Sequence, residues 1–99
     1  MKEYEEEFYW ELRNQIYRVE KKLWIEEGRQ IIKWREELGL TRAFVARETG
    51  IHYSRLARLE KGEPVKDARI LAKLYKLTLE KIEASRKLER LLESFGIKN

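Results

Sequence analysis

The sequence contains no cysteine, so disulfides and thiolate metal sites are excluded. It has a single histidine, His52, and a histidine-based metal site needs more than one. A single proline, Pro64, and five glycines leave long stretches free to form helices. The sequence has no run of roughly 18 uncharged apolar residues, which is the length that a membrane-spanning helix needs. It also has neither a glycine-rich phosphate loop nor a catalytic arrangement of side chains. We therefore expect a cytoplasmic, non-enzymatic protein without metal or cofactor.

Charged side chains are plentiful, at 40% of the residues, and they are unevenly distributed. Residues 28–62 hold eight basic and four acidic side chains, whereas residues 1–27 hold five basic and eight acidic ones. This distribution fits a central segment that faces phosphate and an N-terminal segment that faces something else. A solvated surface of mixed sign would give the same total charge, so the net charge alone does not decide between the two.

Apolar residues recur at helical spacing through the chain, and no stretch alternates as a strand would. The pattern predicts five helices after an N-terminal arm. The first lies between Gly28 and Gly39. Thr41, Asp67 and Thr78 are the predicted N-caps of the second, fourth and fifth.

The arm, residues 2–27, is predicted to be an amphipathic helix with two apolar rows. The first row follows spacings of three and four residues and consists of Tyr9, Leu12, Ile16, Val19 and Leu23. The second row follows a spacing of seven and consists of Trp10, Tyr17 and Trp24. Together the rows cover roughly 200° of the helix. We expect one row to pack on the protein's own domain and the other on a second copy or another protein.

The middle of the chain has the spacing of two short helices joined by a tight turn. The segments GRQIIKWR, GLTRAFVA, GIH and LARLEKG stand at residues 28–35, 39–46, 50–52 and 56–62. With these residues the chain resembles the Cro/C1-type (xenobiotic-response-element-like) helix-turn-helix family over residues 28 to about 82. The resemblance implies an all-α, five-helix fold like that of lambda repressor. We accordingly divide the chain into an arm (1–27), a DNA-binding domain (28–82) and an extension of the last helix (83–99).

The resemblance also implies which residues meet DNA, because in this family the first turn of the third helix faces base edges. The implied base contacts are Tyr53, Ser54, Ala57 and Arg58. The implied phosphate contacts are Arg42, His52, Arg55 and Lys61. Arg58 is the strongest reader, since a guanidinium can bind both acceptors of a guanine. An ion pair between Arg35 and Glu60 is implied as the structural element that fixes the angle of the third helix.

Two positions depart from the family pattern. Arg42 replaces a frequent glutamine and keeps a phosphate donor, and Phe44 stands where a polar residue is usual, as if something covered it. The residues expected to contact a second copy or a partner are Trp10, Tyr17, Trp24, Phe44, Leu92 and Phe95.

These features favour a sequence-specific regulator of transcription that binds double-stranded DNA, from a bacterium, a phage or a mobile element. We expect a homodimer on a pseudo-palindromic operator, and repression is the commoner outcome in the family. One alternative is a protein-interaction module, such as an antirepressor or accessory subunit, that acts through the aromatic arm. Another is an architectural DNA binder of a mobile element with little sequence preference.

Overall fold

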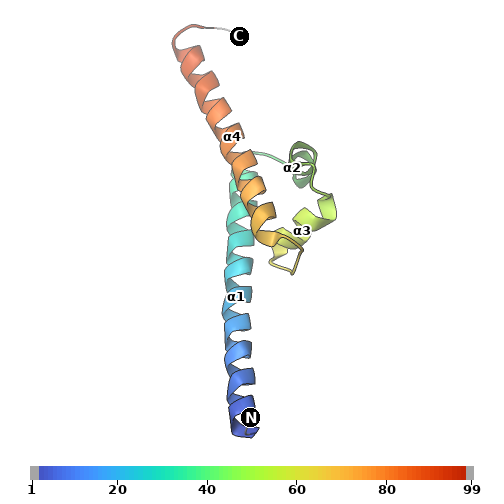
Figure 1. Ribbon diagram of the computed structural model, residues 1–99. Coiled ribbons are helices and arrows are strands. Elements are labelled where there is room, and N and C mark those ends of the chain that lie inside the picture. The colour runs from blue at the N-terminus through green and yellow to red at the C-terminus, as the bar shows by residue number, and fades with distance from the viewer. Residues whose placement is uncertain (1–2, 98–99) are drawn as a thin grey trace.

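The computed structural model describes residues 3–97 and, for side chains, residue 7 onward. Within that part the chain forms α1 (Glu3–Glu37), α2 (Arg42–Thr49), α3 (Tyr53–Lys61) and α4 (Ala68–Ser94), and no strand (Figure 1). The predicted helical class is confirmed. The predicted count of five helices after an arm is wrong, because two of the expected boundaries do not exist. Residues 1–2 of the arm and 98–99 of the C-terminal extension lie outside the described residues.

The first missing boundary is at Gly28, where α1 continues without a break from the arm into the domain. Glycine inside a helix costs about 1 kcal/mol relative to alanine. Here the missing side chain has a packing reason, because a β-carbon on Gly28 would overlap the carbonyl oxygen of Glu60 and lie 2.8 Å from its carbonyl carbon. Gly28 therefore marks the closest approach of α1 and α3 and not a helix end.

The second missing boundary is at Thr78, which lies inside α4 and does not cap a fifth helix. Its hydroxyl donates to the carbonyl oxygen of Leu74, 2.9 Å away, which is how threonine is tolerated within a helix. Tyr75 and Leu79 are fully buried on either side of it. Because the buried face continues past Thr78, packing keeps the helix continuous.

The expected caps at Thr41 and Asp67 have different outcomes. Thr41 caps α2, since its hydroxyl oxygen accepts from the backbone N–H of Phe44 at 3.1 Å. Asp67 holds the N-cap position of α4, but its side chain makes no capping hydrogen bond. Its φ of 59° is left-handed, whereas a capping aspartate needs extended backbone to reach the first turn.

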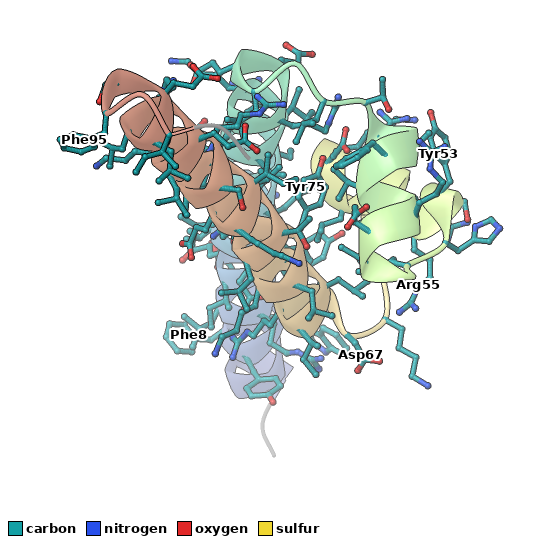
Figure 2. All side chains as sticks on the ribbon, turned by 90° about the horizontal axis from the view of Figure 1, so that it is seen from above. Phe8, Tyr53, Arg55, Asp67, Tyr75 and Phe95 are labelled. Atoms are coloured by element: carbon teal, nitrogen blue, oxygen red, sulfur yellow. The ribbon has the colours of Figure 1, made fainter. Side chains whose placement is uncertain are left out.

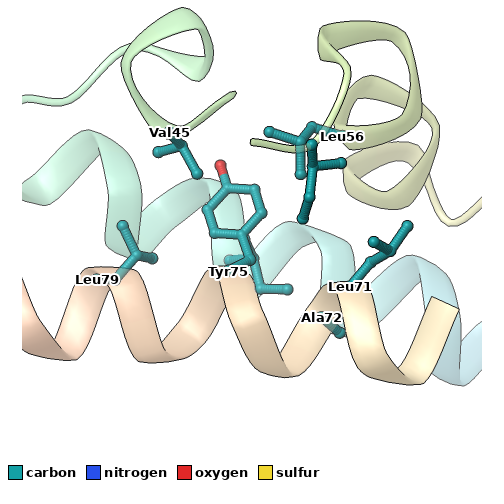
Figure 3. Close-up of a cluster of buried hydrophobic side chains, with 8 residues drawn as sticks. Val45, Leu56, Leu71, Ala72, Tyr75 and Leu79 are labelled. Atoms are coloured by element: carbon teal, nitrogen blue, oxygen red, sulfur yellow. The ribbon is translucent and has the colours of Figure 1, made fainter. Parts of the chain in front are cut away.

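The core lies where α2 and α3 meet the C-terminal half of α1 and the first half of α4. Tyr75 is its largest fully buried residue, and Figure 3 shows the ring between Val45 and Leu56 with its hydroxyl directed toward α2 and α3. The buried cluster consists of Ile31, Val45, Ile51, Leu56, Leu71, Ala72, Tyr75 and Leu79. Residues from all four elements and the turn thus hold α3 in a fixed position.

The molecule is elongated, with extents of 75 × 24 × 18 Å. The N-terminal half of α1 projects beyond the core in one direction and the C-terminal half of α4 projects in the other (Figure 1). From Tyr9 to Leu23 both apolar rows of α1 are exposed. The expectation that one row packs on the protein's own domain is therefore wrong, because no other helix lies beside this part of α1.

Candidate nucleic-acid interface

The short helix α3 has one buried face and one exposed face. Leu56 and Glu60 are buried, whereas Tyr53, Ser54 and Arg58 are exposed. Figure 2 shows the side chains of Tyr53 and Arg55 on the outer side of α3, away from α1. The exposed face therefore starts at the first turn of α3, where the family resemblance places the base contacts.

His52 precedes this face and caps α3. Its Nδ1 accepts from the backbone N–H of Ser54 at 3.2 Å and lies 2.8 Å from the Ser54 hydroxyl. A nitrogen that accepts in this way carries no proton, so the neutral ring carries its proton on Nε2. His52 thus begins the helix with one nitrogen and keeps one N–H for another acceptor.

Tyr53 is held in place by Arg42 of α2. Arg42 Nη1 donates to the Tyr53 hydroxyl oxygen at 2.9 Å, and the guanidinium carbon lies 5.0 Å from the ring centroid. The Tyr53 hydroxyl accepts from Arg42 and so keeps its own proton to donate. The contact fixes an exposed aromatic side chain, 48% accessible, at the start of the outer face.

Behind that face, Arg42 reaches the buried carboxylate of Glu60. Glu60 Oε1 accepts from Arg35 Nη2 at 3.2 Å and from Arg42 Nε at 3.1 Å. Its other oxygen, Oε2, accepts from the Tyr75 hydroxyl at 2.8 Å. We call these residues with Tyr53 the Glu60 network. The structure brings together Arg35 and Glu60, the pair inferred from the sequence, and adds three partners to them.

The pKa values within the Glu60 network follow from these contacts. The hydrogen bond to Glu60 raises the pKa of Arg42, against a smaller opposing effect of its partial burial. Burial, reinforced by the hydrogen bond to Glu60, raises the pKa of the Tyr75 hydroxyl well above its usual range. Both groups thus keep their protons at neutral pH, and the carboxylate is surrounded by donors.

The remaining candidate DNA contacts differ in how free they are. Arg58 and Lys61 are exposed on α3, and Ala57 is half-buried. Arg55 Nη2 donates to the backbone carbonyl oxygen of Lys66 at 2.9 Å, which ties α3 to the loop before α4. Arg42 likewise directs three of its nitrogens at Glu60 and Tyr53. Of the basic candidates, Arg58 and Lys61 have the most open side chains.

The candidate partner contacts are also placed differently from one another. Trp10, Tyr17 and Phe95 are more than half exposed on the two projecting segments. Trp24 lines a cavity of about 190 Å³ with Gly28 and the loop after α3. Phe44 is half-buried against the core, so its own domain covers it. Leu92 is half-buried as well.

Sequence reasoning missed the role of Tyr75. A signal was present, because a tyrosine in a buried stripe needs a partner for its hydroxyl. It also missed that Arg42 reaches Glu60. That contact joins residues 18 positions apart in different helices, and no spacing rule predicts it.

No group of three histidine, cysteine or acidic side chains within the described residues is placed to hold a metal ion. Over the same residues, no helix has both the length and the apolar character that a membrane span requires.

A comparison with protein families finds that the helix-turn-helix family model matches residues 31–82, slightly more than half of the chain. The matched segment contains α2, α3 and the packed parts of α1 and α4. No curated protein and no solved structure that was compared matches the chain.

Proposed function

Since this chain belongs to the Cro/C1-type helix-turn-helix family of DNA-binding transcriptional regulators, we propose that it recognises a specific double-stranded sequence through the outer face of α3. The observation that carries the proposal is the division of α3 into a buried face, with Leu56 and Glu60, and an exposed face. The exposed face carries Tyr53, Ser54 and Arg58. A helix so mounted can enter a major groove without disturbing its own packing.

Within this proposal the side chains have distinct tasks. Arg58 reads a guanine, because its open guanidinium can donate to two acceptors on one base edge. Tyr53, held by Arg42, contacts a thymine methyl or a phosphate, and Ser54 and Ala57 complete the base-facing surface. Lys61, Arg55, Arg42 and the Nε2 of His52 bind phosphates, which position α3 without reading sequence.

We further propose that the protein acts as a homodimer on a pseudo-palindromic operator and represses transcription there. One α3 from each copy would enter successive major grooves about one helical turn apart. Repression then follows from occupancy of the operator, which requires no contact with another protein.

Selection of bound sequences from a random pool of DNA tests the proposal directly. A palindrome with a guanine in each half-site is the expected product. Binding without any enriched sequence would instead indicate an architectural role, and absence of binding would refute the proposal.

The base reader is tested by the Arg58→Ala variant, with Arg90→Ala on the projecting end of α4 as the matched loss of one exposed charge. Arg58→Ala should cost about 1–3 kcal/mol on the selected site and relax the preference at one position of each half-site. Arg90→Ala should change neither. An equal loss on all sequences would reassign Arg58 to a phosphate.

The exposed aromatic rows of α1 favour a second candidate function, which is binding of another protein through the arm. Trp10 is 58% exposed and Tyr17 is 52% exposed, and no other helix lies beside them. A partner that covers them would make the chain an accessory subunit. Loss of a co-purifying protein when Trp10 and Tyr17 are both changed to serine, with α3 intact, would support this role.

A further inference from the structure

The outer face of α4 carries a continuous row of exposed positions that the core does not use. They alternate at spacings of four and three residues, and we call them the outer stripe: Ile70, Leu74, Leu77, Lys81, Ala84, Leu88, Leu91 and Phe95. All eight are exposed, and six are large apolar side chains. The buried residues Leu71, Tyr75 and Leu79 lie on the opposite face of the same helix.

Exposure of such a row of apolar side chains to water is unfavourable in free energy. Ile70 is 61% exposed and Phe95 is 77% exposed, and the stripe runs the length of a 27-residue helix, about 40 Å. Monomeric proteins rarely expose an apolar patch of that extent. The alternating spacing is also that of a coiled-coil seam, in which each apolar side chain inserts between residues of a facing helix.

We propose that the occupant of the outer stripe is a second copy of α4, running antiparallel to the first. This assignment rests on the proposed function, because it supplies the interface of the DNA-binding dimer. In one register each position of the outer stripe lies opposite another position of the stripe on the second copy. Ile70 then faces Phe95 of the second copy, Leu74 faces Leu91, Leu77 faces Leu88, and Lys81 faces Ala84.

The direction follows from the one charged residue in the stripe. In a parallel pair Lys81 would face Lys81 of the other copy inside the seam, which places like charges together. In the antiparallel pair it faces the small side chain of Ala84, which leaves space for the lysine stem to reach water.

Charges beside the stripe select the same register. Glu80 and Lys87 lie one position before Lys81 and Leu88, at the edge of the seam. In the antiparallel register each Glu80 faces Lys87 of the other copy, which gives two opposite-charge pairs per dimer. A parallel pair would bring Glu80 near Ser85 and Lys87 near Leu92, without any charge complementarity.

The resulting dimer places the two DNA-binding faces on either side of its axis. The midpoint of the paired helices lies between Ile82 and Glu83. Tyr75, which bonds to Glu60 of α3, then lies about 15 residues from its symmetry mate, or about 22 Å along the helices. This separation along the helices is smaller than the spacing of successive major grooves, about 34 Å.

Disulfide cross-linking tests the register, because the chain has no cysteine of its own. The variants Leu77→Cys and Leu88→Cys are purified separately, oxidised alone, and oxidised as a mixture. The mixture should give a covalent dimer, and each variant alone should not, because like positions lie about 16 Å apart and a disulfide needs Cα atoms within about 7 Å. Cross-linking of either variant alone would overturn the antiparallel register, and absence of any cross-link would overturn the interface.

Sedimentation without DNA tests the interface independently. Leu88→Lys lies beyond the core, so the fold should persist by circular dichroism while the dimer dissociation constant rises on the order of 100-fold, since two leucines are lost per dimer. Ile16→Lys, an equally exposed change on α1, is the matched control and should leave the dimer intact. A dimer that resists Leu88→Lys but is lost with Ile16→Lys would move the interface to the arm and refute the proposal.

These outcomes separate the interface from DNA recognition. A dimer in sedimentation that selects no DNA sequence would refute the proposed function alone. A protein that selects a DNA sequence but sediments as a monomer would refute the α4 interface alone.

Discussion

At the scale of single residues, the buried carboxylate of Glu60 decides how α3 is held. Its side chain has no exposed surface, and it accepts from Arg35, Arg42 and Tyr75. Removal of a buried charge is costly when it leaves a partner uncompensated. Arg35 is itself buried and bonds to the Leu40 carbonyl oxygen at 2.9 Å, so it cannot turn to water.

The Glu60→Gln variant should therefore lower the free energy of unfolding by about 3 kcal/mol. The amide keeps the shape but loses the charge, and its NH₂ group faces donors. Urea denaturation measures the loss, and the exposed Glu63→Gln should change stability by less than about 0.5 kcal/mol. Equal effects of the two changes would mean that Glu60 is not the residue that fixes α3.

Tyr75 gives the same network a pH dependence at the alkaline end. Burial raises the pKa of its hydroxyl above the unfolded value of about 10. A group with a raised folded pKa contributes stability that is fully present below the unfolded pKa and is lost as the pH rises beyond it. The difference in unfolding free energy between the native protein and Tyr75→Phe should therefore be constant from pH 7 to 9 and shrink above pH 10.

Unfolding by urea at a series of pH values, with both proteins at each pH, checks this trend. The comparison cancels the titration of the lysines, which both proteins share. A difference that stays constant up to pH 11 would show that Tyr75 ionises as easily when folded.

Only part of the Glu60 network could be predicted from the sequence. Arg35 and Glu60 came from the family resemblance, which carries a known pairing across helices. Arg42 and Tyr75 each meet Glu60 from another helix, 18 and 15 residues away. The spacing of residues in a sequence predicts side-chain contacts within one helix. Contacts between helices, such as these, can be predicted only when the positions of the helices are known.

At the scale of elements, the helix boundary predicted at Gly39 is correct. The boundaries predicted at Gly28 and Thr78 are wrong, because both residues lie inside helices. Gly39 follows the end of α1, and its φ of 70° is left-handed. Gly28 was also predicted as a helix boundary because it is a glycine. It lies inside α1 instead, since the backbone of Glu60 in α3 occupies the space that a side chain would need. Thr78 has the chemistry of a cap but donates backward within α4.

The Gly28→Ala variant should consequently destabilise the protein by about 2 kcal/mol or more, although alanine is the better helix former by about 1 kcal/mol. The added carbon would overlap backbone atoms of Glu60, which cannot move aside as a side chain would. Thermal unfolding measures the change. Gln30→Ala, exposed on the same turn of α1, is the control and should be neutral or slightly stabilising. A stabilised Gly28→Ala would show that α1 and α3 are further apart.

At the scale of the whole molecule, two helices project in opposite directions from one small core. The amphipathic pattern of the arm predicted its helix and its two apolar rows. It could not predict that neither row packs on the domain, since that depends on where the other helices end. Of the outer stripe of α4, only Phe95 was predicted to contact a second copy or a partner, and it is 77% exposed.

Deletion of residues 2–20 should leave the free energy of unfolding within about 1 kcal/mol of that of the full chain, because the apolar side chains described in this range, from Phe8 to Val19, are already exposed. The truncated protein should also keep the dimer formed through α4. Urea denaturation and sedimentation check the two expectations. A loss of several kcal/mol would mean that the arm covers the domain in solution, and a monomer would assign the dimer contact to the arm.

The continuity of α1 has an optical consequence. All three tryptophans of the chain lie on this helix, and α3 has none. Trp34 donates to Glu83 at 3.1 Å and so reports on the contact between α1 and α4, whereas Trp10 and Trp24 report on the arm. Indole emission should therefore shift to shorter wavelength when a partner covers the arm and stay unchanged when DNA meets α3. The native protein thus carries a fluorescent signal that separates its two kinds of binding without any added label.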